Sequence, residues 1–239
     1  MRGLIDTHFH LDHYKNHSIL YHYLEDEEQY TLCMTNSPGI YLSCNNVYGN
    51  GQYVKFAMGF HPRERGLGKK ELKDFLYMLP MVNYVGEIGL DFSANAGVDQ
   101  EFQTIAFEKI VKECSYQNKL MSVHIRNAHS VAVDIMNKYR PQKCIVHWFQ
   151  GNAENLQRYI ELGCYFSINT NMIEKNRDIC MQIPKSRVLI ESDGPYTKVD
   201  GKRFSPEKLF ESYEIIARGI EEPDLIKIVF DNFKRILRE

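Results

Sequence analysis

Two histidines occupy alternate positions near the beginning of the sequence, His8 and His10 in the segment IDTHFHLDH. An extended strand sends side chains i and i+2 to the same face, so the two imidazoles would point together into one cavity. Imidazole is the commonest side-chain metal ligand. The pair therefore suits one metal ion, although two surface histidines near a chain end are the alternative on this segment alone.

Short apolar runs recur along the chain, each with the length of a β-strand and none with an internal proline. The runs are residues 3–6, 30–35, 53–59, 84–89, 120–125, 144–149, 164–168 and 188–192. Segments with helical spacing lie between them, for example 102–117, 131–139 and 155–163, where Gly163 is a plausible C-cap. Strand and helix alternating eight times predict an α/β fold, a (β/α)8 TIM barrel. Ser205 and Pro206 would then begin the last helices, which pack outside the barrel.

The composition is that of an ordinary globular protein, with 44% hydrophobic and 25% charged residues. A chain of 239 residues is about as long as one α/β barrel, so we expect a single domain over 1–239. The formal net charge of −2 argues against a protein that coats long DNA. It leaves room for an enzyme that handles a few phosphates locally.

Six cysteines are spread along the chain without a CxxC pair, which is typical of buried thiols in a reducing compartment. The opening MRGLIDTHFH has no apolar signal-peptide core, and no stretch approaches the length of about 18 apolar residues that spans a membrane. We therefore expect a cytoplasmic protein that is not bound to a membrane. The acidic run EDEE (25–28) is expected to form a solvated helix face.

Polar side chains stand within or just after most of the apolar runs. In a (β/α)8 barrel the carboxyl ends of the strands open onto one mouth, where active sites lie, so these side chains would converge. They are His8, His10, His61, Glu87, His124, His147 and Asp193. Such residues could hold two divalent cations with one carboxylate bridging, as in enzymes that hydrolyse phosphate esters. Mixed nitrogen and oxygen ligands suit zinc, manganese or a related metal, whereas magnesium usually relies on oxygen.

Each of these positions also has a structural alternative. Glu87 in an apolar strand would be a costly buried charge without a partner, so a purely structural role is a poor explanation there. His124 or His147 alone would more often be a hydrogen-bonded core histidine, and their occurrence as a pair favours ligands. Asp193 could cap a turn before the Gly-Pro pair that follows it. His61 suits a substrate contact and a loop-shaping role equally.

Six motifs, in this order and spacing, closely resemble the TatD family of metal-dependent deoxyribonucleases in the amidohydrolase-like superfamily. The motifs are DTHFHLD, GFHP, GEIGLDF, VHIRNAH, VHWFQGN and ESDGPY, and the closing DNFKRIL resembles the end of that family. The resemblance covers nearly the whole chain. It implies that His8, His10, Glu87 and Asp193 hold one metal while Glu87, His124 and His147 hold the other, with Glu87 bridging.

The resemblance also implies catalytic and substrate-binding roles. Asp193 and Glu87 would be catalytic: the metal pair held by Glu87 lowers the pKa of a water, and Asp193 orients or deprotonates that water. Arg126 and His61 would meet the substrate phosphate. The implied activity is that of a deoxyribonuclease, a 3′ to 5′ exonuclease on single-stranded DNA with Zn, Mn or Mg as cofactor. The alternatives are hydrolysis of a small ester, amide, phosphate monoester or aminoacylated RNA end, and a subunit that acts only with partners.

Some positions depart from the family pattern. The loop SANAGVDQEFQ after GLDF is poorer in aromatic and basic residues than is usual, and HWFQG and ESDGPY each differ at one position that is not a ligand. The TNSP stretch (35–38) and the compact length resemble a QatD-like subgroup encoded with bacterial antiphage defence systems, which would imply protein partners. Trp148 could stack a base or pack beneath the ligand. Five cations in presumed loops could follow a DNA backbone or be solvated surface, namely Lys69, Lys70, Lys198, Lys202 and Arg203.

Overall fold

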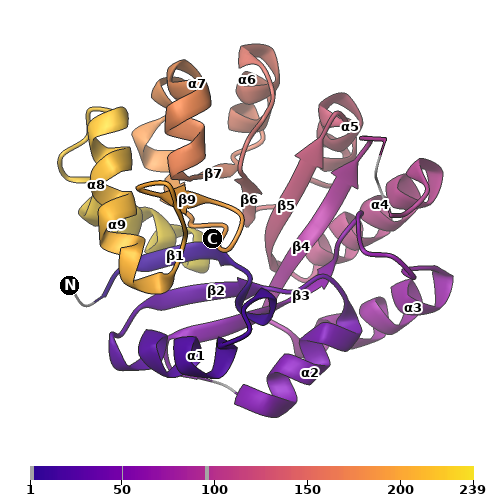
Figure 1. Ribbon diagram of the computed structural model, residues 1–239. Helices are drawn as coiled ribbons and strands as arrows, with labels where there is room; N and C mark the ends of the chain where they lie inside the picture. The colour runs from indigo at the N-terminus through magenta and orange to yellow at the C-terminus, as the bar shows by residue number, and fades with distance from the viewer. Residues whose placement is uncertain (1–2, 50, 95–96) are drawn as a thin grey trace.

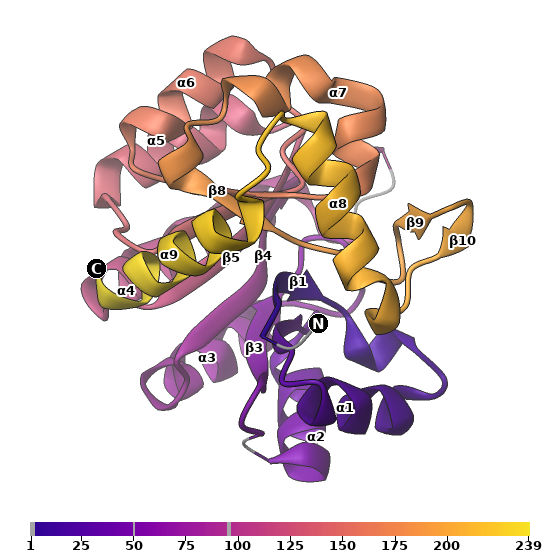
Figure 2. The same ribbon diagram turned by 90° about the vertical axis from the view of Figure 1, so that its left-hand side faces the viewer.

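Eight parallel strands pair in chain order from β1 to β8, with helices arranged around them (Figures 1 and 2). The computed structural model describes residues 3–49, 51–94 and 97–239. The strands are β1 (Ile5–Phe9), β2 (Tyr30–Met34), β3 (Val54–Phe60), β4 (Tyr84–Asp91), β5 (Leu120–Arg126), β6 (Cys144–His147), β7 (Tyr165–Ile168) and β8 (Val188–Ile190). Each predicted apolar run overlaps one of these strands, and the predicted (β/α)8 barrel is confirmed.

Backbone hydrogen bonds just after β8 close the barrel against β1. The Asp193 amide donates to the His8 carbonyl at 2.9 Å, and the His10 amide donates to the Gly194 carbonyl at 2.9 Å. The side chain of Thr7 adds a bond to the Ile190 carbonyl at 2.9 Å. Closure therefore places Asp193, the last of the predicted ligands along the chain, beside His8 and His10, the first two.

The helices lie outside the strands, as the alternation predicts (Figure 1). They are α1 (His17–Asp26), α2 (Pro38–Tyr48), α3 (Lys69–Met78), α4 (Gln100–Tyr116), α5 (His129–Tyr139), α6 (Ala153–Glu161), α7 (Thr170–Gln182), α8 (Leu209–Gly219) and α9 (Leu225–Arg238). Short 3-10 turns occur at Leu11–His13, Leu79–Met81, Lys185–Arg187 and Pro206–Lys208, and β9 (Lys198–Val199) pairs antiparallel with β10 (Lys202–Arg203). None of the helices in the described part of the chain is long and apolar enough to cross a membrane.

Local signals in the sequence mark several helix ends. Gly163 adopts a φ of 81° just past α6, where a side chain would be strained, and its amide bonds back to the Ile160 carbonyl. Ser205 is the N-cap of the turn that leads into α8, with Pro206 at its first position. The prediction for Ser205 and Pro206 is confirmed, and Gly163 lies one residue beyond the C-cap of α6, which is Leu162.

Two expectations need correction. The first strand was expected at 3–6, but β1 runs to Phe9, so His8 lies within the strand and His10 directly after it. The acidic run EDEE is not merely a solvated helix face. The Glu25 carboxylate accepts the backbone amides of Gln52, Tyr53 and Val54 at 2.8–3.2 Å and thereby holds the start of β3.

Gly59 in β3 packs directly against backbone of Thr35, just after β2, and of Glu87 on β4. A side chain there would place its Cβ 1.6 Å from the Thr35 carbonyl oxygen, which leaves no room for it. The same carbonyl accepts the backbone amide of Glu87 at 3.0 Å, and the Thr35 hydroxyl accepts the Gly59 amide at 3.2 Å. The absence of a side chain at Gly59 therefore helps to position Glu87 on β4.

We predict that Gly59→Ala lowers the free energy of unfolding by at least about 3 kcal/mol, because the new methyl group overlaps backbone that cannot move without breaking strand pairing. Urea denaturation followed by circular dichroism measures the loss. Gly39→Ala is the matched control, since a Cβ there meets nothing closer than 3.9 Å. Equal stability of the two variants would contradict the assignment.

Candidate metal centre

The Glu87 carboxylate lies at the centre of the barrel mouth, buried on β4 with 3% of its surface exposed. Its Oε2 faces the end of β1, where the Nε2 atoms of His10 and His8 lie 3.2 and 3.4 Å away. These two nitrogens are 3.3 Å from one another. Asp193 Oδ1 completes this side at 3.5 Å from His10 Nε2 and 3.7 Å from His8 Nε2.

The other carboxylate oxygen of Glu87, Oε1, faces a second group of imidazoles. His147 Nε2 lies 2.8 Å from it, His124 Nδ1 2.9 Å and His61 Nε2 3.2 Å. The facing nitrogens of His147 and His124 are 3.4 Å apart. The two oxygens of one carboxylate thus serve two separate groups of nitrogen donors.

The donor atoms are spaced as the ligands of metal ions would be. Ligands bonded to one ion at about 2.0–2.1 Å lie about 3.3 Å apart in a tetrahedral arrangement, which is close to the separations on both sides of Glu87. Two sets whose donor atoms converge closely enough to hold an ion are His8, His10 and Asp193, and His61, Glu87 and His124. The residues present therefore fit a metal centre.

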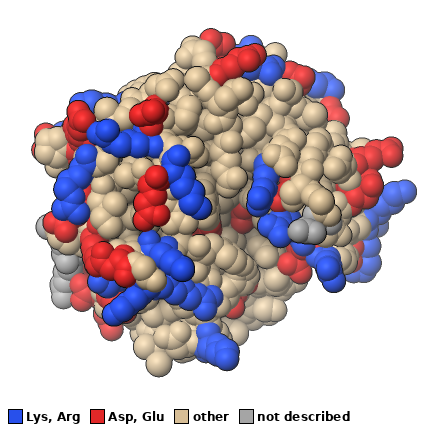
Figure 3. Space-filling model, turned by 45° about the horizontal axis from the view of Figure 1, so that its top comes forward, with Lys and Arg blue, Asp and Glu red and all other residues tan. Residues whose placement is uncertain are grey.

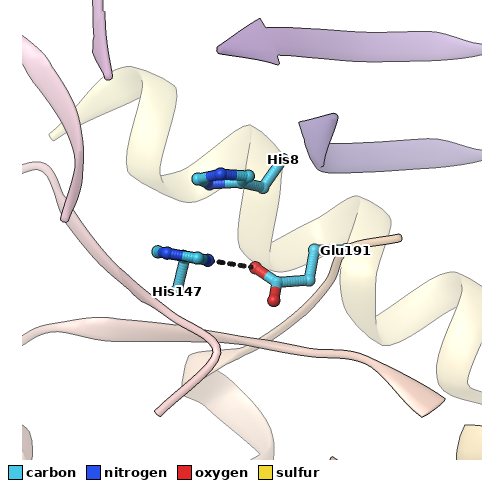
Figure 4. A group of neighbouring side chains, drawn as sticks. All are labelled: His8, His147 and Glu191. Atoms are coloured by element: carbon cyan, nitrogen blue, oxygen red, sulfur yellow. Dashed lines mark ion pairs between the residues drawn. The ribbon is translucent and has the colours of Figure 1, made fainter. Parts of the chain in front are cut away.

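The structure places the seven sequence-predicted residues together, but two of them, His61 and His147, fall into other groups than the resemblance implies. His61, for which a substrate contact and a loop-shaping role were left open, falls within a candidate ligand set. His147 contacts Glu87 and also stacks on the His8 ring at 3.9 Å, and its Nδ1 lies 3.5 Å from a Glu191 oxygen (Figure 4). It consequently belongs to a third convergent set, with His8 and Glu191. Which ligands each ion takes stays a prediction.

Burial and the neighbouring charges act in opposite directions on the ionisable groups. Burial alone would raise the pKa of Glu87, but the facing imidazoles hold it well below its usual range. Burial raises the pKa of Asp193 to about 8 when no ion is bound. Burial likewise opposes a charge on His147, yet Glu87 and Glu191 raise the pKa of that imidazole well above its usual value. The ionisation of each carboxylate and imidazole in the centre therefore depends strongly on the charge of its neighbours.

A second layer of carboxylates orients the histidines, and sequence analysis missed it. Asp91 Oδ2 lies 3.1 Å from His124 Nε2, which directs the opposite ring nitrogen at Glu87. Glu191 lies beside His147 Nδ1 and accepts the side chains of Ser167 and Asn169, the latter at 2.8 Å. Partners of this kind fix the tautomer and the ring orientation of metal-binding histidines.

Asp6 supports the segment that bears Asp193. Its carboxylate accepts the Ser192 amide at 2.9 Å and the Ser192 hydroxyl at 2.5 Å, and burial raises its pKa to about 7. The argument that drew attention to Glu87, a carboxylate inside an apolar run, applies equally to Glu191 in VLIES and to Asp6 in GLID. That signal could have found both.

The centre opens into a cavity of about 700 Å³, lined by residues from several strand ends. Arg126, at the end of β5, lines it as predicted for a phosphate contact, and so do Arg63, Trp148 and Lys175. Trp148 lines the cavity and also packs against the core, so its position suits both stacking on a base and packing beneath the ligand. Figure 3 shows Lys and Arg side chains around a hollow near the middle of one face of the molecule.

The expectation that five cations lie in loops is wrong: Lys69 and Lys70 begin α3, and Lys198, Lys202 and Arg203 lie in β9 and β10. None of the five is among the described residues that line this cavity. Lys70 instead pairs with Asp74 at 3.1 Å, and the guanidinium of Arg203 lies over the Tyr14 ring. The atypical loop after GLDF includes residues 95 and 96, which lie outside the described residues. Its predicted weaker grip on DNA stays a prediction.

A family model described as TatD related DNase matches residues 5–238 of the chain. The chain belongs to this family. It is a metal-dependent hydrolase of the TatD type, and the resemblance stated from the sequence is confirmed. Its membership of the QatD-like subgroup, and the protein partners that would follow from it, stay predictions.

Two relatives and one solved structure match most or nearly all of the chain. An uncharacterized metal-dependent hydrolase, YcfH of Escherichia coli K12, is 26% identical over 98% of this chain and 95% of its own. The 3'-5' ssDNA/RNA exonuclease TatD of Salmonella typhimurium is 27% identical over 84% and 87%. The TatD homolog YJJV of Escherichia coli K12 shares the fold, with a TM-score of 0.86 at 20% identity over 99% of this chain and 98% of that one.

We predict that Asp91→Asn weakens divalent-metal binding by about 10- to 100-fold while leaving the fold intact, because the amide can direct His124 less strongly than the carboxylate. Titration of the metal-stripped protein against a competing zinc indicator measures the affinity. Asp134→Asn, at an exposed position on α5, removes the same charge away from the centre. Wild-type affinity in Asp91→Asn would show that Asp91 does not support the metal centre.

Proposed function

We propose that the protein hydrolyses phosphodiester bonds of DNA with two divalent metal ions, Zn, Mn or Mg, and removes nucleotides from the 3′ end of single strands. The observation behind the proposal is the division of the Glu87 carboxylate, with one oxygen facing His8 and His10 and the other facing His124 and His147. A carboxylate shared in this way suits a two-metal site for displacement at phosphorus. The exonuclease name of a relative that covers most of the chain supports the choice of substrate.

The proposed ligands are His8, His10, Glu87 and Asp193 for one ion and Glu87, His124 and His147 for the other. Bound ions would lower the pKa of a water molecule and neutralise charge on the reacting phosphate. Asp193, with Oδ1 directed at the His8 and His10 side, would orient that water and accept its proton.

Two further side chains would hold the substrate. The Arg126 guanidinium, exposed at the rim of the cavity, presents a planar fork that matches phosphate oxygens. His61, whose Nε2 lies 3.2 Å from Glu87 Oε1, would approach the same phosphate or complete the second ligand set. The mouth admits the end of a strand more readily than the middle of a duplex, which favours exonucleolytic cleavage of single strands.

We predict that Asp193→Asn lowers the hydrolysis rate by at least about a hundredfold and leaves the fold nearly unchanged. Asp193 adopts a φ of 46°, a left-handed conformation that Asn tolerates as well as Asp does, so the backbone should not shift. Rates on end-labelled single-stranded DNA measure the effect, and thermal melting checks the fold. Turnover by the variant at the wild-type rate would refute the role of Asp193.

A second prediction concerns substrate and polarity. The protein is stripped of metal and resupplied with Mg, Mn or Zn, then given single-stranded or duplex DNA labelled at either end. We expect metal-restored shortening from the 3′ end, several-fold faster on the single strand because a duplex must first be opened. Digestion from the 5′ end would overturn the polarity. Turnover of small esters, amides or aminoacylated RNA ends without DNA cleavage would favour the other hydrolase activities, and cleavage only with added partners would favour a role within a defence complex.

A further inference from the structure

Helix α7 contributes one edge of the cavity, and it does so with an unusual backbone. Asn176 adopts φ −141° and ψ 41°, which breaks the helix between Thr170 and Gln182. Asn171 and Lys175, four residues apart and so on one face before the break, both line the cavity, and Asn176 lines it at the break itself. The neighbouring acidic residue, Glu174, is exposed and is not among the described lining residues. The helix therefore directs a cation and two amides at the cavity.

Both ends of this segment are fixed. At its start, the Asn169 side chain donates to Glu191 at 2.8 Å and accepts the Met172 amide at 3.0 Å, which ties the helix to the carboxylate beside His147. After the break, Arg177 donates to the Gly219 carbonyl and to Glu221, both at 2.7 Å. Lys175 thus stands on a segment that is held in register with the metal centre.

The cations at the cavity differ in how far their charge is already compensated. Arg63 lies 3.8 Å from the buried Asp91 carboxylate, so part of its charge is neutralised within the protein. Neither Arg126 nor Lys175 has an ion-pair or hydrogen-bond partner for its side chain among the described residues. Arg126 stands at the end of β5 and Lys175 on the helix after β7, so the two uncompensated charges occupy separate positions around the mouth.

We propose that Lys175, with Asn171 and Asn176 beside it, forms a second phosphate subsite that binds the phosphate on the 5′ side of the scissile one. The inference rests on the proposed phosphodiesterase activity. A phosphate at the centre is met by Arg126, and the next phosphate along the strand reaches α7, where an ammonium supplies charge and two amides supply hydrogen-bond donors. The subsite makes the protein select chains that extend beyond one phosphodiester over isolated diesters.

The first test is a comparison of two dinucleotides, thymidylyl-thymidine with one phosphate and its 5′-phosphorylated form with two. We expect the wild type to prefer the phosphorylated form, and Lys175→Met to lower the ratio of the two kcat/KM values about tenfold, mainly through KM. Lys175→Arg should restore most of the ratio. Lys109→Met, at an exposed lysine on α4, changes the net charge equally and should leave the ratio as it is in the wild type. An unchanged ratio in Lys175→Met would overturn the proposal.

The second test is independent of turnover. Fluorescence anisotropy of a labelled single-stranded oligonucleotide is measured at several salt concentrations on the Asp193→Asn protein, with and without Lys175→Met. Loss of one phosphate contact should weaken binding and reduce the slope of log affinity against log salt by about one. Equal affinity and slope would refute the subsite. If the wild type cleaves no phosphodiester but the affinity and the salt slope still depend on Lys175, the subsite stands and the proposed activity alone fails.

Discussion

The structure of the barrel mouth depends on one buried charge. Glu87 lies on β4 with almost no contact with water, and a carboxylate in that position is tolerable only where partners compensate it. Five imidazoles supply that compensation, and they come from β1, β5 and β6, from the position after β1 and from the position after β3. Because parallel strands end at one face, a closed barrel brings these distant residues within reach of a single side chain.

Compensation at Glu87 requires that the imidazoles be held in turn. Asp91 contacts His124, and Glu191 contacts His147. The Ser122 Oγ lies 2.9 Å from His8 Nδ1. The network extends further from the centre, since Glu191 also accepts a hydrogen bond from the side chain of Asn169, the N-cap of α7. A continuous network of contacts therefore connects the Glu87 carboxylate to α7, which borders the cavity. The same contacts that hold the candidate metal centre also fix the position of α7.

Much of this could be predicted from the sequence, and the parts that could not have a common cause. The eight strands and the convergent residues follow from short apolar runs with polar ends. Strand length and barrel closure depend on this pattern and hardly on which apolar residue stands at each position. Asp91 was missed because its role is to orient another side chain. Glu191 could have been singled out as a carboxylate inside an apolar run, but spacing along the chain does not reveal which histidine either carboxylate faces. Lys175 and Asn176 are harder still, since an exposed lysine on a helix gives no signal that it lines a cavity, and no proline or glycine marks the break at Asn176. The role of Glu25, in an acidic run, was also missed, because the backbone amides that it accepts lie 27 to 29 residues further along the chain.

The distribution of charge constrains how a phosphate substrate can be accommodated. Four carboxylates, those of Glu87, Asp91, Glu191 and Asp193, lie in or directly behind the centre, where the imidazoles face these carboxylates and so are not free to neutralise a phosphate. Arg126 and Lys175, which have no charged partner among the described residues, are exposed to water, and water screens their charge. These two cations can therefore attract a strand, but they do not replace the metal ions that the ligand set around Glu87 would hold. On the proposed function, affinity for the chain and competence for hydrolysis are separate properties, the first belonging to Arg126 and Lys175 and the second to the ligand set around Glu87.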